Sequence, residues 1–307
     1  MFGAVFAVVA ICCVILINPP ASFPAGTLFE VPEGGSVTSV AEKLKNDGFI
    51  ASAFVFRQFV SLFGGQKIIA GDYYFQQKTN VIDLARRITH GIYGLVPLKV
   101  TIPEGFNVRE IAALLADKLP SFDEAGFISA AQGKEGYLFP DTYYVMPDWS
   151  AHEIVDLFNK NFQDKIGNYQ SDIASSTHSL SDIVTVASIV EKEASTPEDR
   201  RIVSGIIWNR LAKNMPLQID ATLGYVLNKG TFQLTQSDLK LDNPYNTYLY
   251  KGLPPTPIGN PGIDAIEAAL HPTKTDYLYY LSDNSGTMHY AKTFEEHKEN
   301  REKYLGK

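Results

Sequence analysis

A strand, a Pro-Glu-Gly turn and an amphipathic helix occur twice in the sequence, about 70 residues apart. The first copy covers 29–44 and reads FEVPEGGSVTSVAEKL, and the second covers 100–115 and reads VTIPEGFNVREIAALL. Apolar residues alternate before each turn, which favours a strand, and then recur every three or four positions, which favours a helix. A chain that builds this unit twice must pack helices against strands, so we expect an α+β fold.

The residues that follow the first copy predict a small module. We expect helices over 53–62 and 81–88 and a strand over 70–75. Together with the first copy they give a module at 27–97. Two interpretations of this module stay open, a packing platform and a carbohydrate-binding module of the LysM type.

The N-terminus is the most apolar stretch of the chain. No charged residue precedes Glu30, and residues 1–17 read MFGAVFAVVAICCVILI. As a helix this stretch would be about 25 Å long, slightly short of a bilayer core. We expect an uncleaved, single-pass anchor in the cell (inner) membrane over 1–18, with a linker at 19–26 and the rest of the chain outside the cytoplasm. A cleaved signal peptide and a buried core helix are the alternatives.

Composition excludes several classes of function. The 307-residue chain has 27 Lys and Arg against 34 Asp and Glu and no basic run, which argues against non-specific binding to nucleic acid. Its two cysteines are adjacent in the apolar stretch, so no disulfide framework is expected. The six histidines lack metal-binding spacing, and P-loop, GxGxxG and GxSxG motifs are absent. We therefore predict no metal and no organic cofactor.

A helix predicted over 179–195, SLSDIVTVASIVEKEAS, carries the strongest candidate for chemistry. Ser179 or Ser181 would cap it, and Glu193 falls at the edge of its apolar face. A carboxyl group among aliphatic side chains has a raised pKa and can hold the proton that a general acid needs. The alternative is that Glu193 pairs with a nearby lysine or arginine as an ordinary surface charge. Glu191 points to the other side, and we expect it to titrate as a surface acid.

Polar and aromatic residues gather after this helix, in LQID at 217–220, NPYNTYLY at 243–250 and GLPPTPIGNPG at 252–262. Aromatic rings pack against sugar faces while amides and hydroxyls bond to sugar hydroxyls, so this composition is typical of carbohydrate binding. The tyrosines of TDYLYYLSD at 275–283 lie instead in a predicted strand, and we interpret them as core residues.

Several segments together resemble the YceG-like (MltG) endolytic murein transglycosylases. They are EGYLFPDTYY, ASIVEKEAS, IIWNRL, MPLQID, NPYNTY, GLPPTPIGNPG and AALHPTKTDYLYYL, in this order. The resemblance implies a mixed α/β catalytic domain at 98–307, in which the catalytic Glu193 lies on a helix, preceded by a LysM-like module. It also implies a set of substrate-binding residues, namely Gln218, Asp220, Asn243, Tyr245, Asn246 and Tyr248.

The reaction implied by the resemblance is cleavage of the MurNAc-β-1,4-GlcNAc bond within peptidoglycan strands, ending the elongation of nascent strands. Glu193 would protonate the glycosidic oxygen and then accept a proton from the MurNAc C6 hydroxyl, which closes a 1,6-anhydro ring. A second carboxylate could assist, and the candidates are Asp220, Glu191 and Asp141. The implied partners are glycan strands, the membrane and cell-wall synthesis enzymes. The alternatives are a non-catalytic wall-binding scaffold and a hydrolytic muramidase.

Overall fold

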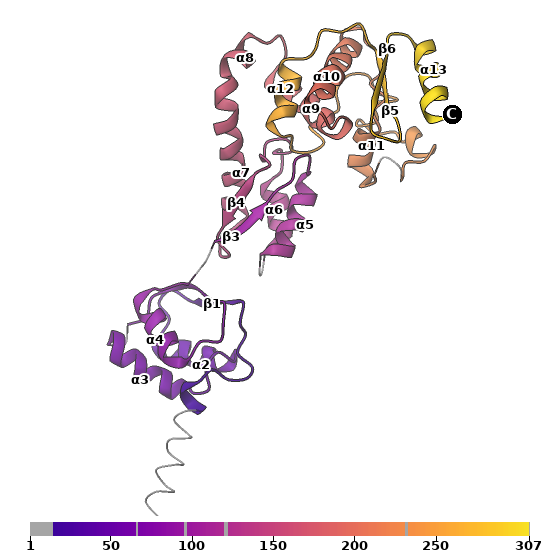
Figure 1. Ribbon diagram of the computed structural model, residues 1–307. Coiled ribbons are helices and arrows are strands. Elements are labelled where there is room, and N and C mark those ends of the chain that lie inside the picture. The colour runs from indigo at the N-terminus through magenta and orange to yellow at the C-terminus, as the bar shows by residue number, and fades with distance from the viewer. Residues whose placement is uncertain (1–14, 66, 95–96, 120–121, 231–232, 307) are drawn as a thin grey trace, which may run out of the picture. The chain divides into compact units, whose positions relative to one another are not determined.

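The protein divides into two compact units, seen in a computed structural model that describes residues 15–65, 67–94, 97–119, 122–230 and 233–306 (Figure 1). The N-terminal unit takes the chain up to residue 99, with 116–122 and 144–149. The larger unit comprises 100–115, 123–143 and 150–307.

Between residues 27 and 90, the described part of the N-terminal unit has one antiparallel pair of strands and three helices. Strand β1 (Thr27–Val31) pairs with β2 (Gly71–Phe75). The helices are α2 (Val37–Asn46), α3 (Ala53–Gly64) and α4 (Val81–His90), and a serine or asparagine side chain caps each one at its N-terminus. The elements predicted between 29 and 88 are therefore confirmed.

The core of this unit is rich in aromatic rings. Phe29, Phe56, Tyr73 and Phe75 are each at most 2% exposed. The first Pro-Glu-Gly turn joins β1 to α2, and its Gly34 has a φ of 72°, in the left-handed region that glycine adopts without strain. The turn residue thus explains how the strand reverses into the helix within a few residues.

The rest of the chain is mainly helical. Its elements are β3 (Leu98–Thr101), α5 (Val108–Lys118), α6 (Glu124–Ala130), β4 (Thr142–Val145), α7 (Ala151–Ile166), α8 (Gln170–Ser175), α9 (Leu180–Glu193), α10 (Pro197–Ala212), α11 (Asp220–Leu227), α12 (Ile263–Leu270), β5 (Tyr279–Ser282), β6 (Met288–Ala291) and α13 (Phe294–Leu305). The second Pro-Glu-Gly turn joins β3 to α5, and its Gly105 has a φ of 76°. The repeat predicted from the sequence is therefore confirmed.

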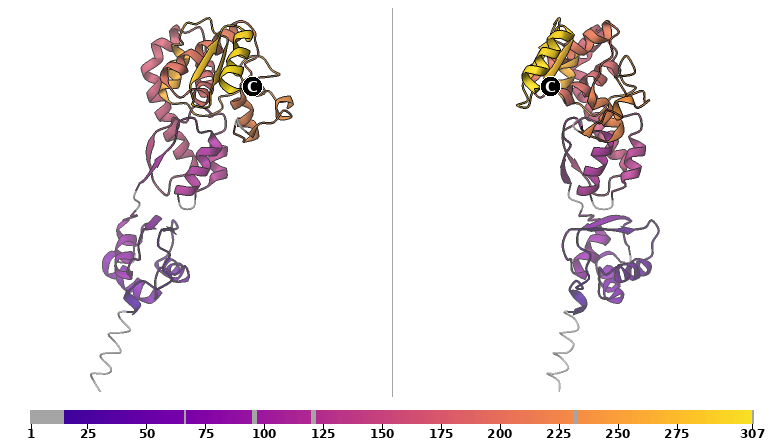
Figure 2. Two further views of the ribbon diagram at one scale, coloured as in Figure 1. Left: turned by 45° about the vertical axis from the view of Figure 1, so that its right-hand side comes forward. Right: turned by 90° about the vertical axis from the view of Figure 1, so that its right-hand side faces the viewer.

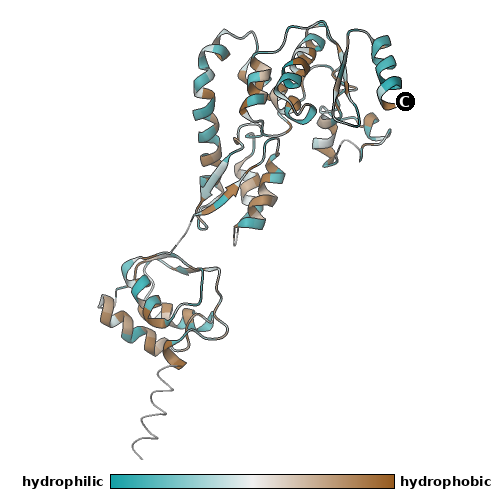
Figure 3. Ribbon diagram, in the orientation of Figure 1, coloured by the Kyte–Doolittle hydropathy of each residue, from teal (hydrophilic) through white to brown (hydrophobic). Residues whose placement is uncertain are grey.

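Helix α9 lies at the centre of the larger unit. Ser179 and Asp182 form a capping box at its start, and the eight residues Ile183–Val190 are all buried. It packs against α10, α11 and α12. At the C-terminal end of the unit, α13 packs on β5 and β6 (Figure 2), and this helix is mostly hydrophilic (Figure 3). Because residues 183–190 are all buried, the backbone of α9 is held in place up to its last residue, Glu193.

The predicted transmembrane helix at 1–18 requires a correction, whereas the α+β class is confirmed. Among the described residues, no helix has the length and apolarity to cross a membrane. A span needs about 20 apolar residues, whereas the longest described helices, α7 and α10, have 16 residues each and carry charges. Residues 1–14, where most of the expected anchor falls, lie outside the described residues. The sheets found in the described ranges are three two-stranded pairs.

Candidate functional site

Glu193 is the last residue of α9 and lines a pocket of about 390 Å³ in the larger unit. The buried body of α9 fixes its backbone. The polar and aromatic residues that line the pocket with it come from α10, α11, β5, α13 and the segments before and after α11: Arg210, Gln218, Asp220, Tyr248, Tyr279, Tyr280 and His297.

One hydrogen bond holds the Glu193 side chain. The Tyr280 hydroxyl donates to Oε2 of Glu193 at 3.0 Å, and Oε1 makes no hydrogen bond to the described residues. Burial raises the pKa of Glu193 to about 7, helped by the negative charge of Asp220 and opposed by the bond from Tyr280. Glu193 can therefore hold a proton on a free oxygen near neutral pH, as a general acid requires.

The interpretation of Glu193 as a surface charge does not hold. No ion pair of Glu193 occurs among the described residues, and the nearby Arg200 pairs instead with Glu191. The expectation that Glu191 is a surface acid is also wrong, because its side chain is 5% exposed and burial raises its pKa. The backbone N–H of Gly262 donates to its Oε2 at 2.9 Å. Glu191 meets protein because Arg200 of α10 and the backbone of Gly262 pack against this end of α9.

Three of the predicted binding residues lie with Glu193. Asp220 is the first residue of α11, and its Oδ1 accepts a hydrogen bond from the Tyr248 hydroxyl at 2.7 Å. Gln218 has a φ of 56°, which is uncommon for a residue with a side chain, and its backbone N–H donates to the Thr247 carbonyl at 3.0 Å. The LQID and NPYNTY segments are thus joined beside the catalytic candidate.

The other three predicted binding residues do not line this pocket. Asn246 is fully buried, and its amide donates to the carbonyls of Leu239 and Leu241 at 3.0 and 2.8 Å. The side chain of Asn243 accepts from the backbone N–H of Tyr245 at 2.9 Å, and Tyr245 lines a separate pocket. Asn243 and Asn246 therefore shape the loop that presents Tyr248.

Of the three candidates for a second carboxylate, Asp220 alone lines the Glu193 pocket. Glu191 is engaged by Arg200 and Gly262. Asp141 accepts hydrogen bonds from the Thr142 backbone and the Asn161 amide, which ties it to the start of β4. Among the residues described, no group of three or more His, Cys, Asp or Glu could hold a metal ion.

Tyr279, Tyr280 and Arg210 line the pocket but are not among the site residues predicted from the sequence. Tyr280 packs against the core of the larger unit, as expected for a tyrosine of 275–283, but its hydroxyl also reaches Glu193 in the pocket. The interpretation as core is wrong for Tyr279, which lines the pocket. Successive strand residues point to opposite faces, so the adjacent Tyr279 and Tyr280 could not both be core residues, and this alternation indicates that one of them lies outside the core. Arg210 lies 4.9 Å from the centre of the Tyr279 ring, and its guanidinium donates to the carbonyls of Leu217 and Leu278. It thereby joins β5 to the LQID segment.

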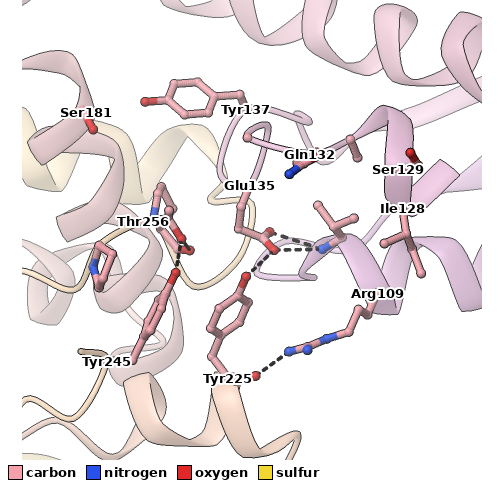
Figure 4. Close-up of a pocket in the computed structure, with 15 residues that line it drawn as sticks. Arg109, Ile128, Ser129, Gln132, Glu135, Tyr137, Ser181, Tyr225, Tyr245 and Thr256 are labelled. Atoms are coloured by element: carbon pink, nitrogen blue, oxygen red, sulfur yellow. Dashed lines mark hydrogen bonds between the residues drawn. The ribbon is translucent and has the colours of Figure 1, made fainter. Parts of the chain in front are cut away.

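A second carboxyl group, that of Glu135, also has a pKa raised to about 7 by burial. Its bonding differs from that of Glu193. The Val108 N–H lies 3.2 Å from each of its oxygens, and the Tyr225 hydroxyl donates to Oε2 at 3.0 Å (Figure 4). The Asn260 amide donates to Oε1 at 3.2 Å. With both oxygens engaged, Glu135 joins structural elements, whereas Glu193 keeps an oxygen free for chemistry.

Comparison with known proteins places the chain in a family, since the sequence pattern of the YceG-like family matches residues 29–303. The chain belongs to the YceG-like family. An endolytic murein transglycosylase of Bacillus subtilis (strain 168) is 33% identical over 302 residues, which cover 90% of this chain and 84% of that protein. That of Streptococcus pneumoniae serotype 2 (strain D39) is 29% identical over 312 residues, which cover 88% of this chain and 57% of the relative.

A solved structure agrees with this family assignment. The 2.6 Å crystal structure of a YceG-like protein from Listeria monocytogenes matches with a TM-score of 0.62 and 31% identity, covering 89% of this chain and 98% of the other. The family resemblance seen in the sequence motifs is confirmed.

Proposed function

We propose that this protein is a lytic transglycosylase that cleaves MurNAc-β-1,4-GlcNAc bonds within peptidoglycan strands and leaves 1,6-anhydroMurNAc ends. The observation that supports this best is Glu193, a carboxyl group with a raised pKa and one free oxygen in a pocket lined by tyrosines. The relatives named endolytic murein transglycosylase support the substrate. Such a substrate implies action outside the cytoplasm.

The first step would be proton transfer from Glu193 to the glycosidic oxygen. The C1–O bond breaks as the proton arrives, its electron pair stays on the departing GlcNAc oxygen, and positive charge develops at C1 of MurNAc. The carboxylate of Asp220 lies in the same pocket and would stabilise that charge. The Tyr280 hydroxyl stays bonded to Oε2 and stabilises the Glu193 carboxylate as it forms.

The second step would return the proton. The Glu193 carboxylate accepts the proton of the MurNAc C6 hydroxyl, O6 bonds to C1, and the 1,6-anhydro ring closes. Glu193 is then protonated as at the start, and no water is consumed. One carboxyl group suffices for both steps because it acts first as acid and then as base. Gln218 and Tyr248, which line the same pocket, would bind the sugar.

We assign binding, not chemistry, to the module at 27–97. None of its described carboxyl side chains is buried, so it offers no acid comparable to Glu193. Its LysM-like character and the involvement of cell-wall synthesis enzymes stay predictions.

The length distribution of the products tests the endolytic assignment. Purified protein acting on isolated sacculi should shorten long glycan strands into medium ones before short products accumulate, as followed by chromatography of strand length. Release of single disaccharides from the first time points would contradict internal cleavage. Strands that stay intact would favour the wall-binding scaffold.

Replacing Tyr280 by phenylalanine should shift the alkaline limb of the pH–rate profile to higher pH. The hydroxyl favours the charged form of Glu193, so its loss raises the pKa of Glu193 above its value of about 7. The measurement is kcat/KM for strand cleavage from pH 5 to 9, in roughly half-unit steps. Tyr277→Phe, in the same segment but outside the pocket, is the control. An unchanged or downward-shifted limb would contradict the role of Tyr280.

Glu193→Gln should stabilise the folded protein at pH 8 but not at pH 4. Below the ordinary pKa of 4.5 the Glu193 carboxyl is neutral in both the folded and the unfolded protein, so it does not affect the free energy of unfolding. Above its folded pKa of about 7, ionisation in water stabilises the unfolded chain more than the folded protein, and glutamine removes this difference. The expected gain is about 3 kcal/mol, at about 1.4 kcal/mol for each unit between a pKa of 4.5 and one of about 7. Urea unfolding at both pH values measures it, with exposed Glu299→Gln as control. Equal gains at both pH values would disprove the raised pKa.

A further inference from the structure

A pocket of about 630 Å³ in the larger unit takes no part in the steps above. Residues from α5, α6, α11 and the segments 243–250 and 252–262 line it (Figure 4). Glu135, at its wall, is engaged by three donors and is not available to bind a cationic ligand.

Two tyrosine rings in this pocket are held in place. The rings of Tyr225 and Tyr245 lie side by side with their centres 5.4 Å apart. The Tyr225 hydroxyl donates to Glu135 at 3.0 Å, and that of Tyr245 bonds to the Thr256 hydroxyl at 2.7 Å. Since their hydroxyls are already bonded, these residues offer a ligand their ring faces, which suit the C–H face of a sugar.

Other polar groups of the pocket retain bonding capacity. The side chains of Ser129, Gln132 and Tyr137 line it and make no hydrogen bond to the described residues. Arg109 is the cation among the described residues that line the pocket. It donates to the Tyr225 carbonyl and lies 5.2 Å from the centre of that ring. The pocket offers hydroxyls, an amide and fixed aromatic rings, which are the groups that bind a sugar. A peptide with several carboxylates would need free cations, and Arg109 is already engaged.

The same two elements line this pocket and the Glu193 pocket. Helix α11 carries Asp220 in the Glu193 pocket and Tyr225 in this one, about 7.5 Å further along its axis. The loop at 243–250 places Tyr248 in the first and Tyr245 in the second. A polymer that is cut internally extends on both sides of the cleaved bond. We propose that this pocket is a second sugar-binding site that holds the glycan strand away from that bond, an inference that rests on the proposed function.

The test measures binding in full-length Glu193→Gln protein, so that strands stay whole. The probe is peptide-free glycan strands, and calorimetry gives their Kd. Gln132→Ala with Tyr137→Phe should weaken binding about 10-fold, because two hydrogen bonds are lost. Ser129→Trp, at an exposed position of α6, should fill the pocket and weaken binding as strongly. Gln170→Ala, exposed and outside the pocket, is the matched control and should bind normally.

Unchanged Kd values in both pocket variants would overturn the proposal. So would weaker binding of strands that carry stem peptides with no effect on peptide-free strands, since the pocket would then hold the peptide. A different result would overturn the proposed function. It would fail if protein that retains Glu193 does not cleave isolated strands, and this outcome does not depend on the binding measured for the pocket variants.

Discussion

Glu193→Gln should lower the rate of strand cleavage by about 10²–10⁴-fold while the protein stays folded and binds glycan. Glutamine keeps the shape of the side chain and can still meet the Tyr280 hydroxyl, but it can neither give a proton to the glycosidic oxygen nor accept one from C6. The measurement is the initial rate of anhydro-end formation from isolated strands, at matched thermal stability.

The matched control for this variant is Glu198→Gln, an exposed acid five residues further along the chain. It should cleave at the wild-type rate. Activity close to wild type in Glu193→Gln, or an equal loss in both variants, would defeat the assignment of Glu193.

Arg200→Ala should lower the free energy of unfolding by about 3–5 kcal/mol. Arg200 and Glu191 form an ion pair whose side chains are 11% and 5% exposed, so the variant leaves a buried acid without its cation. Arg200 also donates through Nε to the Ala194 carbonyl at 3.1 Å, directly after Glu193. Loss of this contact should loosen the end of α9 and reduce activity as well.

Urea unfolding measures this effect, and Arg201→Ala is the control because Arg201 is the exposed neighbour on the same helix. A surface change of this kind should alter stability by no more than about 0.5 kcal/mol. Equal effects in the two variants would show that the Arg200–Glu191 pair does not hold the end of α9.

The parts of the fold that local signals specify could be predicted from the sequence. Gly34 and Gly105 have the positive φ that the Pro-Glu-Gly turns require, and Ser179 caps α9 as expected. Helical spacing also placed Glu193 at the edge of an apolar face. Each of these inferences depends on residues within a few positions of one another.

The parts of the site that depend on distant residues could not be predicted. Tyr280 bonds to Glu193 across 87 residues of sequence. Glu191 is buried because it contacts Gly262, which is 71 residues away in the sequence. The NPYNTY motif predicts a single set of binding residues, yet Asn246 is fully buried while Tyr245 and Tyr248 line different pockets. Such separation follows from tertiary packing, which spacing along the chain does not reveal.

The mass of the strand ends made in ¹⁸O-labelled water tests most directly whether Glu193 drives ring closure and not hydrolysis. If the C6 hydroxyl attacks C1, every new MurNAc end is one water lighter than a reducing end and carries no ¹⁸O. We expect this product from wild-type protein and almost none of it from Glu193→Gln. New MurNAc ends that form as reducing ends, heavier by one labelled water than the anhydro end, would show that water attacks C1 and that the ring does not close.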